Sequence, residues 1–249
     1  MIGEAVALRP RSSGATVDLG IALFREESGG IFRDAAVPLG VALVASALVY
    51  AWDPYAAVAS AMGFGRFAQA PVTRVLAARA SGTERPRGWR PALRDLAQGA
   101  RVRIAAWSLL TLSALGGPLA IWVWVRQLFW PEVVLLEAPG HGEITRANQL
   151  AVVRGTTALA MSAWLMVIEL WAAMAGELVG QGAWNDMLQL GQPFGSLGNG
   201  DVTPFVVVGI IAAQPVIAAV RFAAYLDART RAEALDVFFA LRAAGGGAQ

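Results

Sequence analysis

Four charged residues stand inside otherwise apolar stretches of this chain, where a charge needs a partner. Arg126 and Glu132 lie within PLAIWVWVRQLFWPEVVLLE, residues 118–137, and Arg66 and Glu169 lie within two further apolar stretches. Roughly 20 mostly apolar residues are enough to cross a bilayer core. Charges buried in lipid are costly and usually face protein or water. The four residues are therefore candidates for an intramembrane charge cluster, whose chemistry would be ion pairing or the passage of a polar solute.

The depth of each charge predicts its partner. At about 1.5 Å per residue, Arg126 lies roughly 12 Å below the outer surface and Glu169 about 13 Å. By the same count Arg66 lies roughly 16 Å deep and Glu132 about 21 Å. We predict that Arg126 pairs with Glu169, and that Arg66 pairs with Glu132 or with backbone carbonyls. Such pairs can fix helix register without any transport, or they can line a polar path between the second, fourth and fifth spans.

The sequence offers little support for catalysis. It contains no G-x-S-x-G, H-E-x-x-H or Walker motif and no cysteine. The one histidine, His141, lies in a polar segment near Glu137 and Glu143, and a lone loop histidine is more often solvated than catalytic. We expect no catalytic residue, metal or cofactor.

The composition is typical of an integral membrane protein. Of the 249 residues, 56% are hydrophobic and 15% are charged, whereas soluble domains are about 45–50% apolar and about 25% charged. The apolar stretches occupy most of the chain and leave no room for a soluble core. The N-terminus lacks the pattern of a cleavable signal peptide, so we expect Met1 onward to remain on the mature chain.

The apolar stretches predict an all-α polytopic membrane bundle with about six transmembrane helices and an amphipathic helix at each cytoplasmic end. The spans are expected at about 35–51, 56–77, 102–116, 118–137, 155–178 and 203–222. Residues 1–34 would form a cytoplasmic arm and an interfacial helix, in which Val17, Ile21 and Phe24 recur at near-helical spacing. This helix either lies on the inner leaflet or packs against the end of the bundle.

Residues 223–249 would form a cytoplasmic amphipathic helix and a disordered tail. Leu235, Phe238 and Phe239 fall on one side of this helix. Two pairs are spaced four residues apart, so that they can form on its surface: Asp227 with Arg231, and Arg229 with Glu233.

Loops and breaks are expected at several further places. Residues 138–154 would be a polar inner loop. Residues 179–202 would be an outer loop that can hold a short interfacial helix around Trp184–Leu190, and Pro215 would interrupt the sixth span. Glycines and Pro71 make the second span irregular. Small residues in the second and fifth spans predict close helix contacts. They are Gly63, Gly65, Ala172, Ala173 and Gly176.

A run of arginines sets the predicted orientation. Under the positive-inside rule, such a run marks a cytoplasmic loop. The expected lipid-facing basic loop consists of Arg79, Arg85, Arg87, Arg90, Arg94, Arg101 and Arg103. Every arginine outside the spans falls in a predicted inner segment, so both termini should be cytoplasmic and the protein should lie in the cell inner membrane. The expected partners are anionic lipid headgroups and a further membrane protein or a second copy, but not nucleic acid.

Three short motifs carry a resemblance to a known family. They are RPRSS before the first amphipathic helix, Arg126 with Pro131 and Glu137, and YLDAR at Tyr225–Arg229. In these motifs, and over nearly its whole length, the chain resembles the membrane domain of bacterial glycerophosphoryl diester phosphodiesterases and the stand-alone membrane proteins related to it. It departs from them after Glu137, where relatives carry a double arginine followed by serine. The resemblance implies an all-α membrane domain and no catalysis, because the phosphodiesterase activity belongs to a separate soluble barrel, which we do not expect in this chain.

Two functions remain open from the sequence. The first is a non-catalytic scaffold or subunit of a membrane assembly, whose basic loop and terminal helices organise lipid or a partner at the cytoplasmic face. The second is a small transporter or channel whose path passes the intramembrane charge cluster. A hydrated cavity at those charges would favour transport, and a closed core would favour the scaffold.

Overall fold

The computed structural model describes residues 11–82, 97, 101, 104, 125, 128–137, 142–154, 156–191 and 194–245, with backbone alone for 153, 154, 156, 157 and 234–245. Every element that it describes is helical. The elements are α2 (Ser13–Tyr50), α3 (Pro54–Gly65), η1 (Arg66–Ala68), α4 (Gln69–Ser81), α7 (Trp130–Glu132), η2 (Val133–Glu137), α8 (Glu143–Arg154), α9 (Thr156–Gly182), η3 (Ala183–Met187), η4 (Leu197–Asn199) and α10 (Pro204–Gly245).

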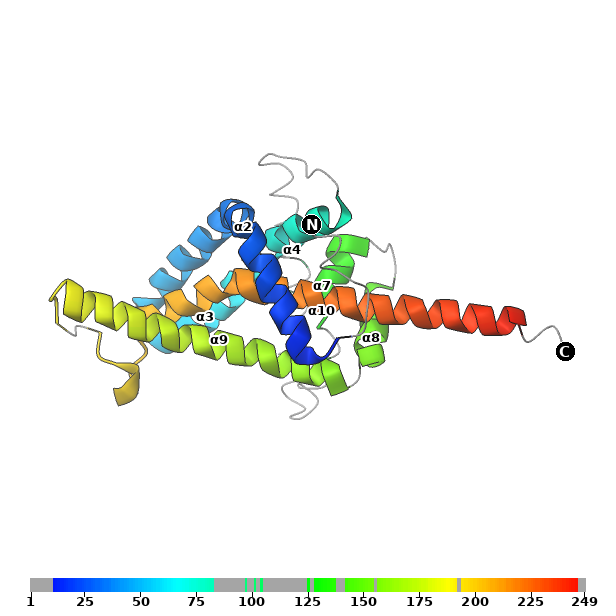
Figure 1. Ribbon diagram of the computed structural model, residues 1–249. Coiled ribbons are helices and arrows are strands. Elements are labelled where there is room, and N and C mark those ends of the chain that lie inside the picture. The colour runs from blue at the N-terminus through cyan, green and yellow to red at the C-terminus, as the bar shows by residue number, and fades with distance from the viewer. Residues whose placement is uncertain are drawn as a thin grey trace.

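The longest helix, α10, runs through the centre of the molecule (Figure 1). In the part of the chain described, three helices are long and apolar enough to cross a membrane: α2, Ala158–Met187 and Pro204–Glu233. The most apolar stretch of α10 is 78% buried, against 28% in α2 and in α9. The predicted all-helical membrane class is therefore supported, and α10 is the element around which the other helices pack.

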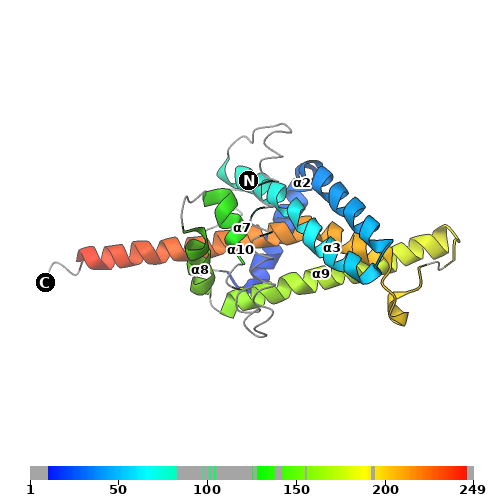
Figure 2. The same ribbon diagram turned by 180° about the vertical axis from the view of Figure 1, so that it is seen from behind.

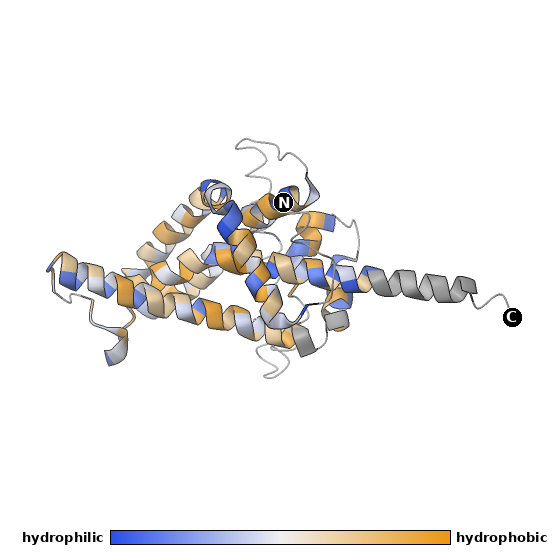
Figure 3. Ribbon diagram, viewed as in Figure 1, coloured by the Kyte–Doolittle hydropathy of each residue, from blue (hydrophilic) through white to orange (hydrophobic). Residues whose placement is uncertain are grey.

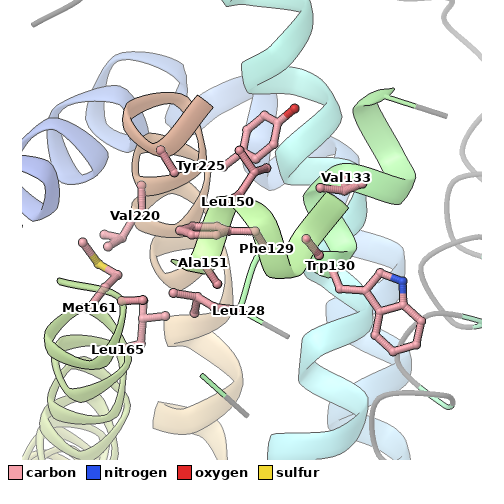
Figure 4. Close-up of a cluster of buried hydrophobic side chains, with 14 of the residues drawn as sticks. Leu128, Phe129, Trp130, Val133, Leu150, Ala151, Met161, Leu165, Val220 and Tyr225 are labelled. Atoms are coloured by element: carbon pink, nitrogen blue, oxygen red, sulfur yellow. The ribbon is translucent and has the colours of Figure 1, made fainter. Parts of the chain in front are cut away.

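The largest hydrophobic cluster among the described residues lies where α7, η2, α8, α9 and α10 meet, and Val17 of α2 joins it. Phe129, Leu150 and Met161 are fully buried there and lie close to Val220 of α10 (Figure 4). Two further clusters join α10 to α2 and α4, and to α2 and α3. Hydrophobic positions dominate these helices, whereas hydrophilic positions gather near α8 and at the bend of α2 (Figure 3).

The predicted interfacial helix and first span form one helix, α2. Ser12 begins it by accepting a hydrogen bond from the amide of Ala15 at 3.2 Å. The helix is clearly bent (Figure 1). Pro38 and the stretch Ser28–Gly30 lie inside it, and proline, glycine and serine are the residues at which helices usually kink. The bend lets the two halves of a single helix take different directions.

The predicted second span is divided into α3, the 3₁₀ turn η1 and α4. Asp53 begins α3 by accepting hydrogen bonds from the amides of Tyr55 and Ala56. The expected irregularity therefore falls at Gly65–Ala68. A short 3₁₀ segment inside a helix often marks a strained or functional position, and here it carries Arg66.

Four expectations about segments are corrected by the structure. Residues 143–154 of the predicted inner loop form α8, because Ala147, Leu150 and Ala151 recur at helical spacing and are buried. The cytoplasmic helix expected within residues 223–249 is a continuation of α10, and Pro215 does not interrupt α10. The short helix expected around Trp184–Leu190 is η3, which directly continues α9 and is not a separate element of the outer loop. Most of the predicted third and fourth spans lies outside the described residues.

The predicted close contacts are confirmed for four of the five small residues. A Cβ on Gly65 would lie 2.9 Å from Cγ of Gln214, and one on Gly176 would lie 2.5 Å from the carbonyl oxygen of Phe205. Ala172 and Ala173 lie against Gly209 of α10. Gly63 is the exception, because no heavy atom of the described residues outside its own turns of helix lies within 4 Å of its Cβ position.

Segments far apart in sequence meet at each end of the bundle. Tyr50 and Tyr55 donate hydrogen bonds to the carbonyl oxygens of Val202, at 2.8 Å, and Gly200, at 2.9 Å. The turn after α2 and the loop before α10 therefore share one end. At the other end α8 packs beside α10, and the end of α10 extends past the body of the molecule (Figures 1 and 2).

Candidate functional site

Polar side chains follow one face of the central helix. Gln214, Arg221 and Tyr225 are separated by seven and then four residues, which places them on the same side of an α-helix. They are 0%, 6% and 1% exposed. Buried polar groups in a membrane helix need partners, and these residues obtain theirs from four other elements.

The part of the site around Gln214 joins α10 to α9, η1 and α4. Nε2 of Gln214 donates to Oε1 of Glu169 at 3.1 Å and to the carbonyl oxygen of Ile210 at 3.1 Å. The other carboxylate oxygen of Glu169 lies 3.8 Å from Nη2 of Arg66, an ion pair whose side chains are 12% and 17% exposed. Nε2 of Gln69 donates to Oε1 of Gln214 at 2.7 Å. Gln214 thus connects the carboxylate of Glu169 on α9 with the side-chain amide of Gln69 on α4.

The other part of the site is centred on Arg221. Its Nη1 donates to Oε1 of Gln69 at 3.0 Å, and its Nη2 donates to the carbonyl oxygen of Leu128 at 2.6 Å. The same Nη2 forms an ion pair with Oε2 of Glu132 at 2.8 Å. Glu132 is 2% exposed. We name the six connected residues the buried polar chain: Arg66, Glu169, Gln214, Gln69, Arg221 and Glu132.

A second cluster follows toward the α8 end. Tyr225 donates to Oε1 of Glu137 at 2.7 Å, and Arg146 forms an ion pair with Oε2 of Glu137 at 3.0 Å. Glu132 and Glu137 stand at the two ends of the segment formed by the last residue of α7 and η2. This one short segment brings two acids into contact with α10. Its second part, η2, is a π-helix, a form that is frequent at functional sites.

At the opposite end, Glu177 fastens the loop before α10. Glu177 is 7% exposed and accepts hydrogen bonds from the amide of Leu197 at 3.0 Å, from Gln181 and from the hydroxyl of Thr203. Its carboxylate therefore has several donors and a structural role in holding that loop to α9.

The structure changes the predicted pairing of the charge cluster. Glu132 pairs with Arg221. Arg66, which was predicted to pair with Glu132 or with backbone carbonyls, pairs with Glu169. The predicted pair of Arg126 with Glu169 stays a prediction. Arg126 lies outside the described residues. Three of the four predicted charges thus belong to the buried polar chain, but in two different pairs.

Arg221, Gln69 and Gln214 were missed by the sequence reasoning. Arg221 stands at the end of the predicted sixth span, where an arginine is usually interfacial. The signal that could have found it is the spacing of seven and four residues from Gln214 to Tyr225.

The predicted basic loop is described at two positions only. Arg79 forms an ion pair with Glu27 at 2.9 Å and is 59% exposed, and Arg101 is exposed. The other five arginines of that loop lie outside the described residues, as does His141. Across the described residues, no three His, Cys, Asp or Glu side chains could together hold a metal ion.

The arrangement is electrically balanced. Its two arginines and two glutamates compensate one another, and its amides connect the pairs. Nε of Arg221 is buried and has no hydrogen-bond partner in the described structure.

Comparisons with family models, curated proteins and solved structures give no match. The resemblance to the phosphodiesterase membrane domain stays a prediction.

Proposed function

We propose that the protein is a non-catalytic integral membrane protein that acts as a scaffold or subunit of a membrane assembly. The observation that carries the proposal is the buried polar chain, in which each carboxylate already has an arginine of the same bundle beside it. Closed pairs of this kind hold helices in register. A conducting path instead needs polar groups that remain open to water or solute. The resemblance noted above supports the same proposal, because catalysis in that family belongs to a separate domain.

We extend the proposal to six spans in the cell inner membrane, with both termini cytoplasmic. The distribution of charge between the two ends supports this orientation. Around the turn after α2 and the loop before α10, the described residues include Asp53, Asp186 and Asp201 but no arginine. Arg79 and Arg101 follow the predicted second span and would face the cytoplasm, where they would meet anionic lipid headgroups.

Photo-crosslinking tests the scaffold function. Leu48 on α2 and Trp171 on α9 are each 71% exposed, so these apolar faces meet either lipid or a protein partner. A photo-reactive side chain at one of the two positions is expected to give a protein adduct of discrete mass in intact cells. The same side chain at the fully buried Leu150 is the control and should give none. Lipid adducts alone at both exposed positions would contradict the scaffold proposal.

Transport is the second candidate function, favoured by the unpartnered Nε of Arg221 on a polar chain that crosses the bundle. Accessibility at Ala218 separates the two functions. This fully buried residue lies one turn from both Gln214 and Arg221 on the same helix face. In the scaffold, Ala218→Cys should resist a membrane-impermeant thiol reagent in right-side-out and inverted vesicles, because the core is closed.

Two exposed positions control this measurement and test the orientation. Trp52→Cys, at a residue 88% exposed, should react in right-side-out vesicles, and Arg101→Cys should react in inverted ones. The reverse pattern at these two positions would contradict the orientation. Reaction at Ala218→Cys would show a hydrated path and would replace the scaffold proposal with transport.

A further inference from the structure

The leading segment of α2, residues 13–34, crosses the central helix and packs on it through one face. It crosses α10 steeply before α2 bends (Figure 1). Gly20 lies at the crossing, where a Cβ would be 2.5 Å from Cα of Val220. Leu23 and Ile31 are 6% and 0% exposed and belong to the cluster that joins α2 to α4 and α10. This face is therefore fixed to the bundle.

The rest of α2 returns along α10 in the opposite direction. Ala42 is buried in a cluster with α3 and with the first turns of α10, and Tyr50 donates to the carbonyl oxygen of Val202, just before α10 begins. Both α2 and α10 are long and apolar enough to cross a membrane. Because no loop separates the two parts of α2, the leading segment starts where the crossing part ends. A segment that crosses a spanning helix steeply at that point runs along the membrane surface.

The two open flanks of the leading segment differ in chemistry. Ile21 and Phe32, 39% and 49% exposed, lie about three turns apart on one flank, and Phe24 packs edge-on against Phe32 with ring centroids 5.7 Å apart. Glu26 and Arg33 are exposed and lie about two turns apart on the other side of the packed face. An apolar flank opposite a charged one is the arrangement of helices that lie in a membrane interface.

The charges of the leading segment do not favour anionic lipid. Interfacial helices that anionic lipids attract are rich in Lys and Arg. Here two arginines stand among four acids: Arg25 and Arg33 with Asp18, Glu26, Glu27 and Asp34. Arg33 also has its Nε 3.2 Å from the carboxylate of Asp34. The apolar flank is therefore the part of this surface that can hold a bilayer.

We infer that the leading segment of α2 binds the lipids of one leaflet by inserting Ile21, Phe24 and Phe32 at the level where the acyl chains begin, without a requirement for anionic headgroups. Lipid is favoured over a protein occupant because the same helix continues directly into the part that crosses the membrane, and because the opposite flank keeps its charges in water. The inference goes beyond the scaffold proposal. It holds whichever end of the bundle is cytoplasmic.

Fluorescence quenching in vesicles tests the inference on this cysteine-free chain. A bimane label at Phe32→Cys is compared with the same label at the control position Glu26→Cys, in phosphatidylcholine vesicles. A lipid with a nitroxide near its headgroup should quench the label at residue 32 about threefold more than the label at residue 26, because insertion is shallow. Iodide in the water should show the reverse preference. Quenching of both labels by iodide, with no effect of the nitroxide lipid, would overturn the inference.

Two further comparisons test the depth and the lipid chemistry. At Val41→Cys, in the crossing part of α2 and 59% exposed in the unchanged protein, a nitroxide near the chain end should quench more than one near the headgroup, and at Phe32→Cys it should quench less. Adding phosphatidylglycerol should leave the quenching at Phe32→Cys unchanged. A dependence on that lipid would overturn the claim that charge is not needed. Protection of Phe32→Cys from both quenchers would assign the flank to a protein, and loss of that protection on dilution in lipid would identify a second copy.

Discussion

Replacing Arg221 with methionine is expected to lower the free energy of unfolding by about 3–5 kcal/mol, because it leaves Glu132 as an uncompensated buried charge. Arg221 is 6% exposed, Glu132 is 2% exposed, and their charged atoms lie 2.8 Å apart. The change also removes the donors to Gln69 and to the carbonyl oxygen of Leu128. The measurement is denaturant unfolding of the purified protein in detergent.

Arg79→Met is the matched control. It breaks an ion pair of similar length, with Glu27 at 2.9 Å, but Arg79 is 59% exposed. Exposed pairs contribute about 0–1 kcal/mol, so this variant should unfold nearly as the unchanged protein does. The double variant Arg221→Met/Glu132→Leu removes both charges and should recover most of the loss. Equal effects of Arg221→Met and Arg79→Met would show that the buried pair does not hold the bundle together.

The helical class follows from composition, but the partners of the charges do not. The depth count placed Arg66 only about 3 Å from the level of Glu169, a difference that an arginine side chain easily bridges. Depth along the membrane normal therefore does not select among arginines at similar levels. Which arginine pairs with a given glutamate depends on which helices face each other. The bend of α2 and the turn η1 change how the helices face each other, and a count of residues from the span ends does not include either.

Arg221 was missed because α10 is longer than a membrane span. A span ending at residue 222 makes Arg221 an interfacial residue, free to reach water. In the structure, α8 and η2 fold back against the following turns, so Tyr225 and Ala228 are 1% and 0% exposed. The interior of the protein thus continues past the predicted membrane boundary, and Arg221 lies inside it. The apolar spacing in α8 was visible in the sequence, but Arg146 and Arg154 favoured a loop.

Gly209→Ala is expected to destabilise the contact of α9 with α10 by about 1–3 kcal/mol, the usual cost of overpacking a core. A Cβ at this position would lie 2.2 Å from the carbonyl oxygen of Ala172 and 3.0 Å from its carbonyl carbon. These are backbone atoms, so the helices themselves must separate. Helix propensity alone would make alanine more stabilising than glycine by about 1 kcal/mol. A measured loss of stability would therefore come from the packing clash. Thermal unfolding in detergent measures it.

Gly63→Ala is the control with the opposite expected sign. Gly63 is also inside a helix. Among the described residues, no atom outside its own turns of helix lies within 4 Å of its Cβ position, so alanine should stabilise the protein by about 0.5–1 kcal/mol. Gly176 extends the test, because its Cβ would lie 2.8 Å from Cα of Gly209. Once one alanine has separated the helices, the second meets less resistance. Gly176→Ala/Gly209→Ala should therefore cost less than the sum of the single changes. A gain in stability from Gly209→Ala would mean that the two backbones are not in contact, and that small residues there do not set the distance between α9 and α10.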